Sequence, residues 1–244
     1  MKDMKYFKQE LFPTIWCPGC GIGLAMKETA NAFEELGLKN NQISVVSGIG
    51  CSGRAAGYFK ADSIHGCHGR AIPVAEGLKR ANPELNVIVF SGDGDIVGIG
   101  GNHLIHSPRR DTDITVICIN NQTYGLTGGQ LAPTSSKGAI TMTSPYGSNY
   151  YPINIQGLIL ANKRFFYART TAFHIDHMRK CIKEALQFKG FSFVEVITNC
   201  VETYGKRQGY TDAYQMLMEY KNKYKIVSGK DRLEDNEIGI VKKE

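Results

Sequence analysis

The sequence predicts an α/β fold with a mostly parallel sheet and helices on both faces. Short apolar runs that suit buried strands alternate with longer segments whose apolar residues recur at helical spacing. Glycine-rich turns follow several of the strand-like runs, as the ends of parallel strands often require. The chain has 244 residues, which suits one domain over residues 1–244, with a charged C-terminal tail at 214–244.

Composition indicates a soluble, cytoplasmic protein with no membrane partner. Hydrophobic residues make up 42% of the chain and charged residues 21%, both ordinary for a globular protein. No apolar run approaches the ~20 residues that cross a bilayer, and the segment Met1–Glu10 lacks the apolar core of a secretory signal. The net charge is +6 without a basic stripe interleaved with aromatics, so we expect no nucleic-acid binding.

Apolar periodicity places the individual elements. We expect strands at Gln42–Ser47, Asn86–Phe90, Asp113–Ile119, Phe165–Ala168 and Phe191–Ile197. We expect helices at Ile22–Leu36, Ala71–Ala81, Ile96–His106, Ile153–Ala161 and His174–Phe188. Pro108 is expected to stop the third helix, and His174 and His177 to be solvated on the last. Residues 58–67 are expected to be irregular and the last dozen residues loose, after a helix that ends near Tyr224.

A carboxylate and a carboxamide follow two neighbouring strands of this pattern. Gly92-Asp93-Gly94 comes after the strand Asn86–Phe90, and Asn120-Asn121 ends the next strand 26 residues beyond Gly94. Mg²⁺ prefers hard oxygen ligands and usually retains phosphate oxygens in its shell. Asp93, Asn121 and the backbone carbonyl of Thr123 therefore form a candidate site for magnesium and a diphosphate.

Each half of this pattern also has a plain structural explanation. Gly-Asp-Gly alone is most often a tight turn, and Asn-Asn a turn that ends a strand. Their pairing after two strands favours the functional interpretation. The glycines fall at 92, 94 and 98, which is not the spacing of a dinucleotide-binding fingerprint.

Seven cysteines are many for a reducing compartment, where disulfides are rare, so a metal or catalytic role is expected. Cys17 and Cys20 form a Cys-x-x-Cys motif at a helix start, where the helix end favours thiolates. A structural zinc or a redox dithiol remains an alternative for this motif. Four residues each follow a different predicted strand and so share one sheet edge: Cys51, Asp93, Asn121 and Cys200.

The remaining cysteines are weaker candidates for a functional role, and His68 and Arg54 are stronger ones. Cys118 falls within a strand and Cys181 within a helix, so both are expected in the core. Cys67 stays ambiguous beside His68, which opens a helix and is the better functional candidate. Arg54 follows the glycine loop and is a candidate for binding a substrate carboxylate in a bidentate contact.

Several motifs, in order, resemble one family. They are Trp16–Gly21, Gly48–Ser52, His68–Ala71, Gly92–Asp95 and Asn121–Thr127, and the match covers about Leu11–Gly205. Gly-Asp-Gly followed by Asn-Asn is similar to the thiamine-diphosphate motif. The whole set resembles the β subunit of 2-oxoacid:ferredoxin oxidoreductases, most of all those that act on 2-oxoglutarate.

The resemblance implies roles for particular residues. Cys17, Cys20, Cys51 and Cys200 correspond to the ligands of a [4Fe–4S] cluster. Asp93 and Asn121, with Thr123, correspond to the magnesium ligands, and His68 to a catalytic residue at the cofactor. The resemblance implies thiamine diphosphate contacts from Ile49, Gly50, Cys51, Ser52, His68, Gly92, Gly94, Asp95, Leu126 and Thr127.

The same resemblance implies a reaction and partners. The expected activity is CoA-dependent oxidative decarboxylation of a 2-oxoacid to an acyl-CoA and CO₂, with electrons passed through the cluster to ferredoxin. The chain has room for only the diphosphate-binding half of a thiamine site, so we expect a heterodimer with an α subunit, or an α/γ arrangement. Pyruvate or branched-chain substrates, a simple decarboxylase or carboligase, and a non-catalytic iron–sulfur or zinc-binding subunit remain alternatives.

Overall fold

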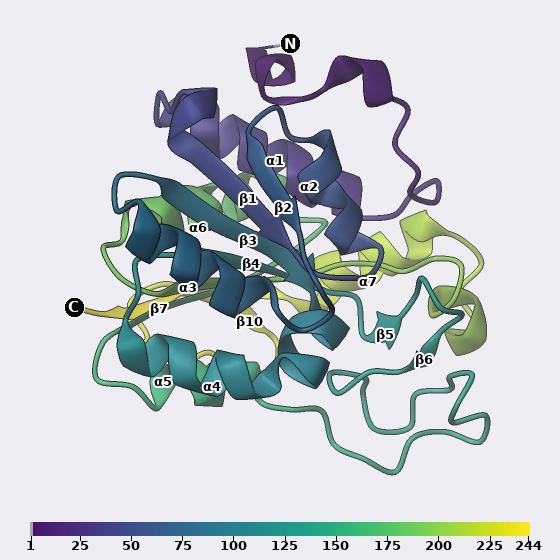
Figure 1. Ribbon diagram of the computed structural model, residues 1–244. Coiled ribbons are helices and arrows are strands. Elements are labelled where there is room, and N and C mark those ends of the chain that lie inside the picture. Colours follow the sequence, from purple (N-terminus) through teal and green to yellow (C-terminus); the bar gives the residue numbers. More distant parts are fainter. Residues whose placement is uncertain (1) are drawn as a thin grey trace.

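The computed structural model describes residues 2–244, which form ten strands and seven α-helices besides short helical turns (Figure 1). Eight of the strands make up a central sheet. The strands are β1 Ile43–Ser47, β2 Asp62–His65, β3 Asn86–Gly92, β4 Thr115–Asn120, β5 Thr123–Tyr124, β6 Gln130–Leu131, β7 Phe165–Thr171, β8 Ser192–Ile197, β9 Lys225–Ile226 and β10 Glu237–Lys243. The helices are α1 Ile22–Glu35, α2 Ala55–Tyr58, α3 Ala71–Ala81, α4 Gly101–Arg110, α5 Ile155–Leu160, α6 Ile175–Gln187 and α7 Ala213–Lys223.

The sheet is mostly parallel, which confirms the predicted fold class. Its strand order is β2-β1-β3-β4-β8-β7-β10-β9. The six strands from β2 to β7 pair in parallel. β10 runs antiparallel to β7, and β9 pairs in parallel with β10, so these two strands at one end of the sheet run opposite to the other six. Because β1, β4 and β8 are buried along their whole length, they need apolar side chains on both faces, and the sequence supplies continuous apolar runs.

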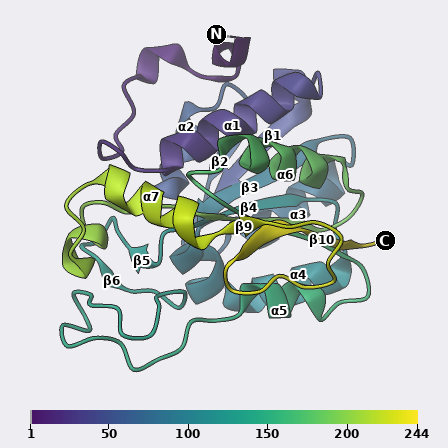
Figure 2. The ribbon, with the colours of Figure 1, turned by 180° about the vertical axis from the view of Figure 1, so that it is seen from behind.

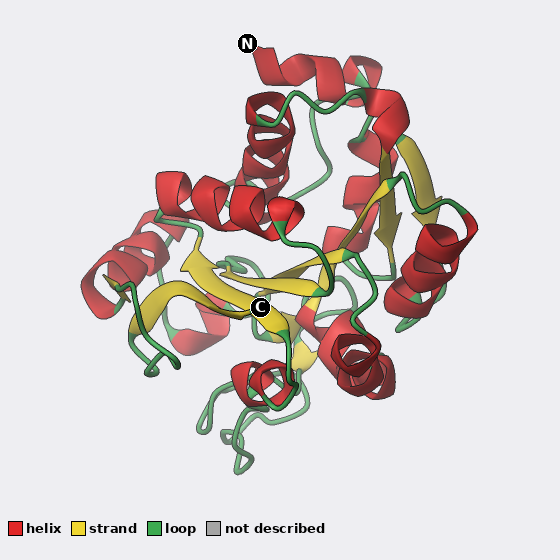
Figure 3. Ribbon diagram, turned by 90° about the vertical axis from the view of Figure 1, so that its left-hand side faces the viewer, coloured by secondary structure: helices red, strands yellow, loops and turns green. Residues whose placement is uncertain are grey.

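Helices cover both faces of the sheet (Figures 2 and 3). One core cluster joins α1, α2 and α6 to one face, with Phe33, Phe59 and Ile182 among its fully buried members. The other cluster joins α3, α4 and α5 to the opposite face, around Ile72 and Leu104. Among the described residues, no helix combines the length and apolarity that crossing a bilayer requires.

Four local expectations were wrong. Residues 62–65 form the edge strand β2, although all four are exposed, because its backbone pairs with β1. Pro108 lies inside α4 rather than ending it, near the C-terminus of a helix that runs to Arg110. The predicted helix at Ile96–His106 is divided into a π-helical turn, Gly94–Ile99, and α4. The last dozen residues are not loose, since Glu237–Lys243 adds β10 to the sheet beside β7.

His177 is another correction, because it is largely enclosed rather than solvated. Its Nδ1 lies 3.0 Å from Thr170 Oγ1, on the neighbouring strand β7, and its ring contacts Cys181. Burial lowers the pKa of His177 to about 4, helped by the nearby His174 and Lys180. The folded protein therefore holds this imidazole neutral at pH values where an unfolded chain protonates it.

This enclosure predicts acid sensitivity. Below the ordinary histidine pKa of about 6.5 the unfolded state binds more protons, so the free energy of unfolding should fall as the pH drops from about 6.5 towards 4. His177→Gln should flatten that slope in urea titrations at pH 7, 6 and 5. Ser63→Ala, on the exposed strand β2, removes no titratable group, so it is the control and should leave the slope unchanged. An equal slope in the His177→Gln protein would contradict the prediction.

Candidate functional site

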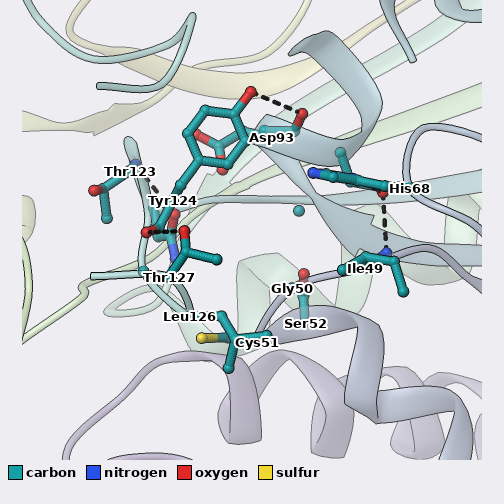
Figure 4. A pocket seen from close by; sticks show the side chains of 15 residues that line it. Ile49, Gly50, Cys51, Ser52, His68, Asp93, Thr123, Tyr124, Leu126 and Thr127 are labelled. Atoms are coloured by element: carbon teal, nitrogen blue, oxygen red, sulfur yellow. Dashed lines mark hydrogen bonds and ion pairs between the residues drawn. The ribbon is translucent and has the colours of Figure 1, made fainter. Parts of the chain in front are cut away.

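A cavity of about 110 Å³ opens at the carboxyl edge of the sheet, where β1, β3 and β4 end (Figure 4). Asp93 directly follows β3, and Asn121 directly follows β4. All fifteen residues that line the cavity were predicted from the sequence or lie in its quoted motifs. They are Ile49, Gly50, Cys51, Ser52, His68, Gly92, Asp93, Gly94, Asp95, Asn121, Thr123, Tyr124, Gly125, Leu126 and Thr127.

The carboxylate of Asp95 joins three segments beside this cavity. Its Oδ1 accepts hydrogen bonds from the backbone N–H groups of Ile49, at 3.0 Å, and Gly69, at 2.8 Å. His68 Nδ1 lies 2.5 Å from the same oxygen, and Ser91 Oγ donates to Oδ2 at 2.8 Å. Asp95 is only 2% exposed, so its carboxylate has lost its hydrogen bonds to water, and these donors take their place. A cofactor contact through its side chain therefore stays a prediction.

Two glycines let the backbone approach these side chains. A Cβ at Gly48 would lie 2.1 Å from Asp95 Oδ2, and a Cβ at Gly94 would lie 2.3 Å from the ring of Tyr124. Any larger residue at either position would displace the carboxylate or the ring. The π-helical turn that begins at Gly94 places Asp95 toward β1, and such turns are frequent at functional sites.

His68 presents one ring nitrogen to the cavity. Because Asp95 is an acceptor, the Nδ1 of His68 carries the hydrogen of their contact, which leaves Nε2 available to a ligand. The ring of Tyr124 meets the imidazole edge to face, with centroids 6.2 Å apart. The side chain of His68 is 30% exposed, so a ligand can reach it from solvent.

Asp93 is a buried carboxylate held only by neutral donors. It is 1% exposed, and its Oδ2 accepts hydrogen bonds from Thr134 Oγ1 and from the backbone N–H of Gln122, the latter at 3.1 Å. Burial raises the pKa of Asp93 to about 6, despite those hydrogen bonds. A cation at the cavity would compensate the charge, so this carboxylate suits a divalent metal.

The other two predicted magnesium ligands lie nearby. Asn121 Oδ1 accepts a hydrogen bond from the backbone N–H of Thr123, at 3.3 Å, and both residues line the cavity with Asp93. The Thr123 carbonyl accepts a hydrogen bond from Gly125 N, at 3.0 Å, and retains a second lone pair. Over residues 2–244, no three histidine, cysteine, aspartate or glutamate side chains are grouped to hold a single metal ion.

A second cavity, of about 230 Å³, is lined by the four predicted cluster cysteines, Cys17, Cys20, Cys51 and Cys200. Cys17 is exposed and the other three are partly buried, and all four are free thiols. Trp16 anchors the approach by donating from Nε1 to the Cys51 carbonyl at 2.8 Å. The fold therefore gathers residues that are up to 183 positions apart in the sequence.

Burial, rather than the helix end, dominates the chemistry of Cys20. Burial, together with smaller contributions from the nearby Cys200, Cys51 and Cys17, raises the pKa of the Cys20 thiol to about 12. Burial likewise raises the pKa of Cys51 to about 11. The hydrogen bond from the backbone at Ile22, where α1 begins, lowers the pKa of Cys20 as expected, but burial outweighs this effect.

The two cavities share a wall. Cys51, Asn121, Gly125 and Leu126 line both of them. A Cβ at Gly125 would lie 3.4 Å from Cys200 Sγ and 3.7 Å from Cys51 Sγ, so the wall is thin. In Figure 4, Cys51 and Leu126 lie on one side of the first cavity and Asp93 on the other. A ligand bound to Asp93 could therefore extend toward the cysteines.

The structure also separates some predictions and adds residues. Arg54 is exposed on a 3-10 turn and lines neither of these two cavities. Tyr124 was quoted only within a motif, yet its hydroxyl donates to the Gly94 carbonyl at 3.2 Å. Thr134 was missed, because nothing in its surrounding sequence indicates that the loop returns to Asp93. Cys118 and Cys181 are buried, as predicted.

Comparison with protein families defines the class of this site. Residues 48–196 match the family model described as "Thiamine pyrophosphate enzyme, C-terminal TPP binding domain". This stretch runs from the loop after β1 to the end of β8 and includes Asp93, Asn121 and most of the first cavity. The fold is thus that of a thiamine-pyrophosphate-binding domain.

Similar proteins narrow the class further. The 2-oxoglutarate synthase subunit KorB of Archaeoglobus fulgidus is 46% identical over 239 residues, which cover 98% of this chain and 88% of that one. KorB of Methanothermobacter marburgensis is 45% identical over 214 residues, 88% of this chain and 75% of that one. The chain belongs to the family of 2-oxoacid:ferredoxin oxidoreductase β subunits, an enzyme family.

A solved structure agrees with this assignment. It is described as 2-oxoglutarate:ferredoxin oxidoreductase from Magnetococcus marinus with 2-oxoglutarate, coenzyme A and succinyl-CoA bound. The two chains have a TM-score of 0.84 at 32% identity, over 96% of this chain and 77% of that one.

The Asp95 contacts predict a measurable stability loss. Asp95→Asn keeps the shape but replaces a charged acceptor of several hydrogen bonds with a neutral one, so the free energy of unfolding should fall by about 2 kcal/mol. Chemical denaturation checks this, with Asp62→Asn on exposed β2 as the control. Equal stabilities of the two variants would show that the Asp95 charge does not hold these loops.

Proposed function

We propose that this chain is the β subunit of a 2-oxoglutarate:ferredoxin oxidoreductase. In this function it supports the CoA-dependent oxidative decarboxylation of 2-oxoglutarate to an acyl-CoA and CO₂ in the cytoplasm, with ferredoxin as electron acceptor. The observation that carries the proposal is the wall shared by the cavity at Asp93 and the cavity of four cysteines. The names of the relatives and of the similar structure support the choice of reaction.

The first cavity suits thiamine diphosphate with Mg²⁺. Asp93, Asn121 and the Thr123 carbonyl would hold the cation, and the buried negative charge of Asp93 supports that assignment. When bound, thiamine diphosphate supplies a nucleophilic carbon for attack on the 2-oxo group and accepts the electrons left by decarboxylation. Ile49–Ser52, Gly92, Gly94, Leu126 and Thr127 would position the cofactor, and Asp95 would orient His68 toward it.

The second cavity suits a [4Fe–4S] cluster. Four thiols around one space are the usual ligand set of such a cluster, and iron would favour the thiolate forms of Cys20 and Cys51. A structural zinc usually draws its ligands from two short-spaced pairs, whereas Cys51 and Cys200 are isolated in the sequence. Its place behind Gly125 and Leu126 would let it take electrons one at a time from the neighbouring site.

The size of the first cavity supports a partner subunit. Sites for small molecules commonly enclose roughly 300–1,000 Å³, and this cavity holds about 110 Å³. Apolar side chains at its mouth are also exposed, with Leu126 at 54% and Ile49 at 40%. A partner α chain, alone or with a γ portion, would cover this surface and complete the site. Arg54 would then bind the substrate carboxylate from the rim, in a contact that the isolated chain leaves open.

Removal of the metal-binding carboxylate should separate the two sites. In the assembled, anaerobically purified complex, Asp93→Ala should abolish thiamine diphosphate binding, because it removes the only charged ligand proposed for Mg²⁺. Iron content should remain at about four atoms for this subunit's cluster, since the cysteine cavity lies across the wall. Calorimetry and iron analysis provide the measurements, with Asp62→Ala as the control. Loss of iron together with thiamine in a folded protein would mean that the two sites are not separate.

The choice of substrate can be tested directly. With saturating coenzyme A and an electron acceptor, 2-oxoglutarate should give a kcat/KM at least about tenfold above that of pyruvate or a branched-chain 2-oxoacid. One well-placed hydrogen bond to its second carboxylate is enough for a difference of this size. Faster reduction of the electron acceptor with pyruvate would leave the proposed enzyme class standing but contradict the proposed substrate. Zinc without thiamine in the purified complex would instead support a non-catalytic subunit.

A further inference from the structure

Glu195 places a carboxylate in the middle of the central strand β8, where charge is costly. It is 5% exposed, and β8 lies between β4 and β7 in the sheet. A buried carboxylate needs strong hydrogen-bond partners. None of the residues assigned to the cofactor or to the cluster contacts it, so its presence needs another explanation.

The partners of Glu195 come from both neighbouring strands. On the β7 side, Oε2 accepts hydrogen bonds from the hydroxyl of Tyr167 and from Arg169 Nε, the latter at 3.2 Å. On the β4 side, Oε1 accepts a hydrogen bond from Asn120 Nδ2 at 2.7 Å. The carboxylate can only accept, so it fixes the orientation of the Asn120 amide, with Nδ2 toward β8.

That orientation reaches the proposed metal site. With its Nδ2 held by Glu195, Asn120 offers Oδ1 to the backbone N–H of Gln122, at 3.3 Å. The same N–H also donates to Asp93 Oδ2, at 3.1 Å. Asn121, the second proposed metal ligand, lies between Asn120 and Gln122 in the chain.

The backbone at this point needs such support. Gln122 has a φ of 60°, in the left-handed region that residues other than glycine rarely adopt. Such a conformation is strained and persists only where surrounding contacts hold it. The contacts of Asn120 and Asp93 with the Gln122 N–H are of this kind, and they turn the chain so that Asn121 lines both cavities.

We propose that Glu195 is a positioning residue for the cation: through Asn120 it holds the strained turn that presents Asn121 and orients Asp93. This inference rests on the proposed function, because it concerns the Mg²⁺ that would bind the cofactor diphosphate. Residues that orient metal ligands commonly change metal affinity by 10–100-fold when replaced.

Glu195→Gln tests the orientation of the amide. A glutamine has one acceptor oxygen, which the charged Arg169 would claim, so its NH₂ group would face the NH₂ group of Asn120. Asn120 should then turn over and present a donor to the Gln122 N–H. In the assembled complex, the Mg²⁺ concentration that gives half-maximal thiamine diphosphate binding should rise at least about tenfold, as measured by equilibrium dialysis.

Two further variants keep the test independent of folding. Asn120→Ala leaves the Glu195–Arg169 ion pair intact and should raise the half-saturating Mg²⁺ concentration by a similar factor. Tyr167→Phe removes a different hydrogen bond of Glu195 and should lower stability without changing that concentration. Iron content should match wild type in all three, since none contacts the cysteine cavity.

The outcomes separate this inference from the function on which it rests. Wild-type Mg²⁺ dependence in folded Asn120→Ala or Glu195→Gln complexes would overturn the positioning role and leave the proposed function intact. An equal shift in Tyr167→Phe would also overturn it, because general loosening of the sheet would then suffice. A wild-type complex that binds no thiamine diphosphate at any Mg²⁺ concentration would overturn the proposed function, and the inference with it.

Discussion

The buried carboxylate of Asp95 is the interaction on which the geometry of the first cavity depends. It joins the loop after β1, the turn before α3 and the end of β3 through donors on Ile49, Gly69, His68 and Ser91. The pairing of β1 with β3 ends at Val46 and Val89, before these segments begin. The contact with Asp95 is the one among these hydrogen bonds that positions His68 at the cavity. The Asp95 carboxylate also packs against the backbone of Gly48, where no side chain larger than hydrogen fits.

The parallel sheet supplies the second constraint, because it delivers several chain segments to one edge. β1, β3, β4 and β8 all end there, and the residues after them line one cavity or the other. Cys51 and Asn121 lie in the shared wall, so a cofactor site and a cysteine site are neighbours without a dedicated connecting element. A second buried carboxylate, Glu195 on β8, accepts a hydrogen bond from Asn120 at the end of β4 and so links these two strands near the same edge.

Much of this edge was predictable because its residues follow strands and carry distinctive chemistry. Cys51, Asp93, Asn121 and Cys200 could be grouped because each follows a predicted strand, whereas only the family resemblance joined Cys17 and Cys20 to them. The structure brings all of these residues to two adjacent cavities. Thr134 and Glu195 could not be found this way, because their partners lie 41 and 75 residues away and their local sequence is ordinary. β2 and β10 were missed because each depends on pairing with a distant strand rather than on its own periodicity. The pKa of Cys20 depends on burial, which only the fold determines.

The proposal that depends most on this geometry is electron transfer from the cofactor in the first cavity to a [4Fe–4S] cluster held by the four cysteines of the second. Electron paramagnetic resonance of the anaerobic complex, given 2-oxoglutarate and coenzyme A without ferredoxin, tests this most directly. We expect the signal of a reduced [4Fe–4S] cluster to appear only when thiamine diphosphate is bound, and to be lost in Cys200→Ser. The proposal would be contradicted if a complex loaded with thiamine diphosphate and iron turned over substrate while the cluster at these cysteines stayed oxidised.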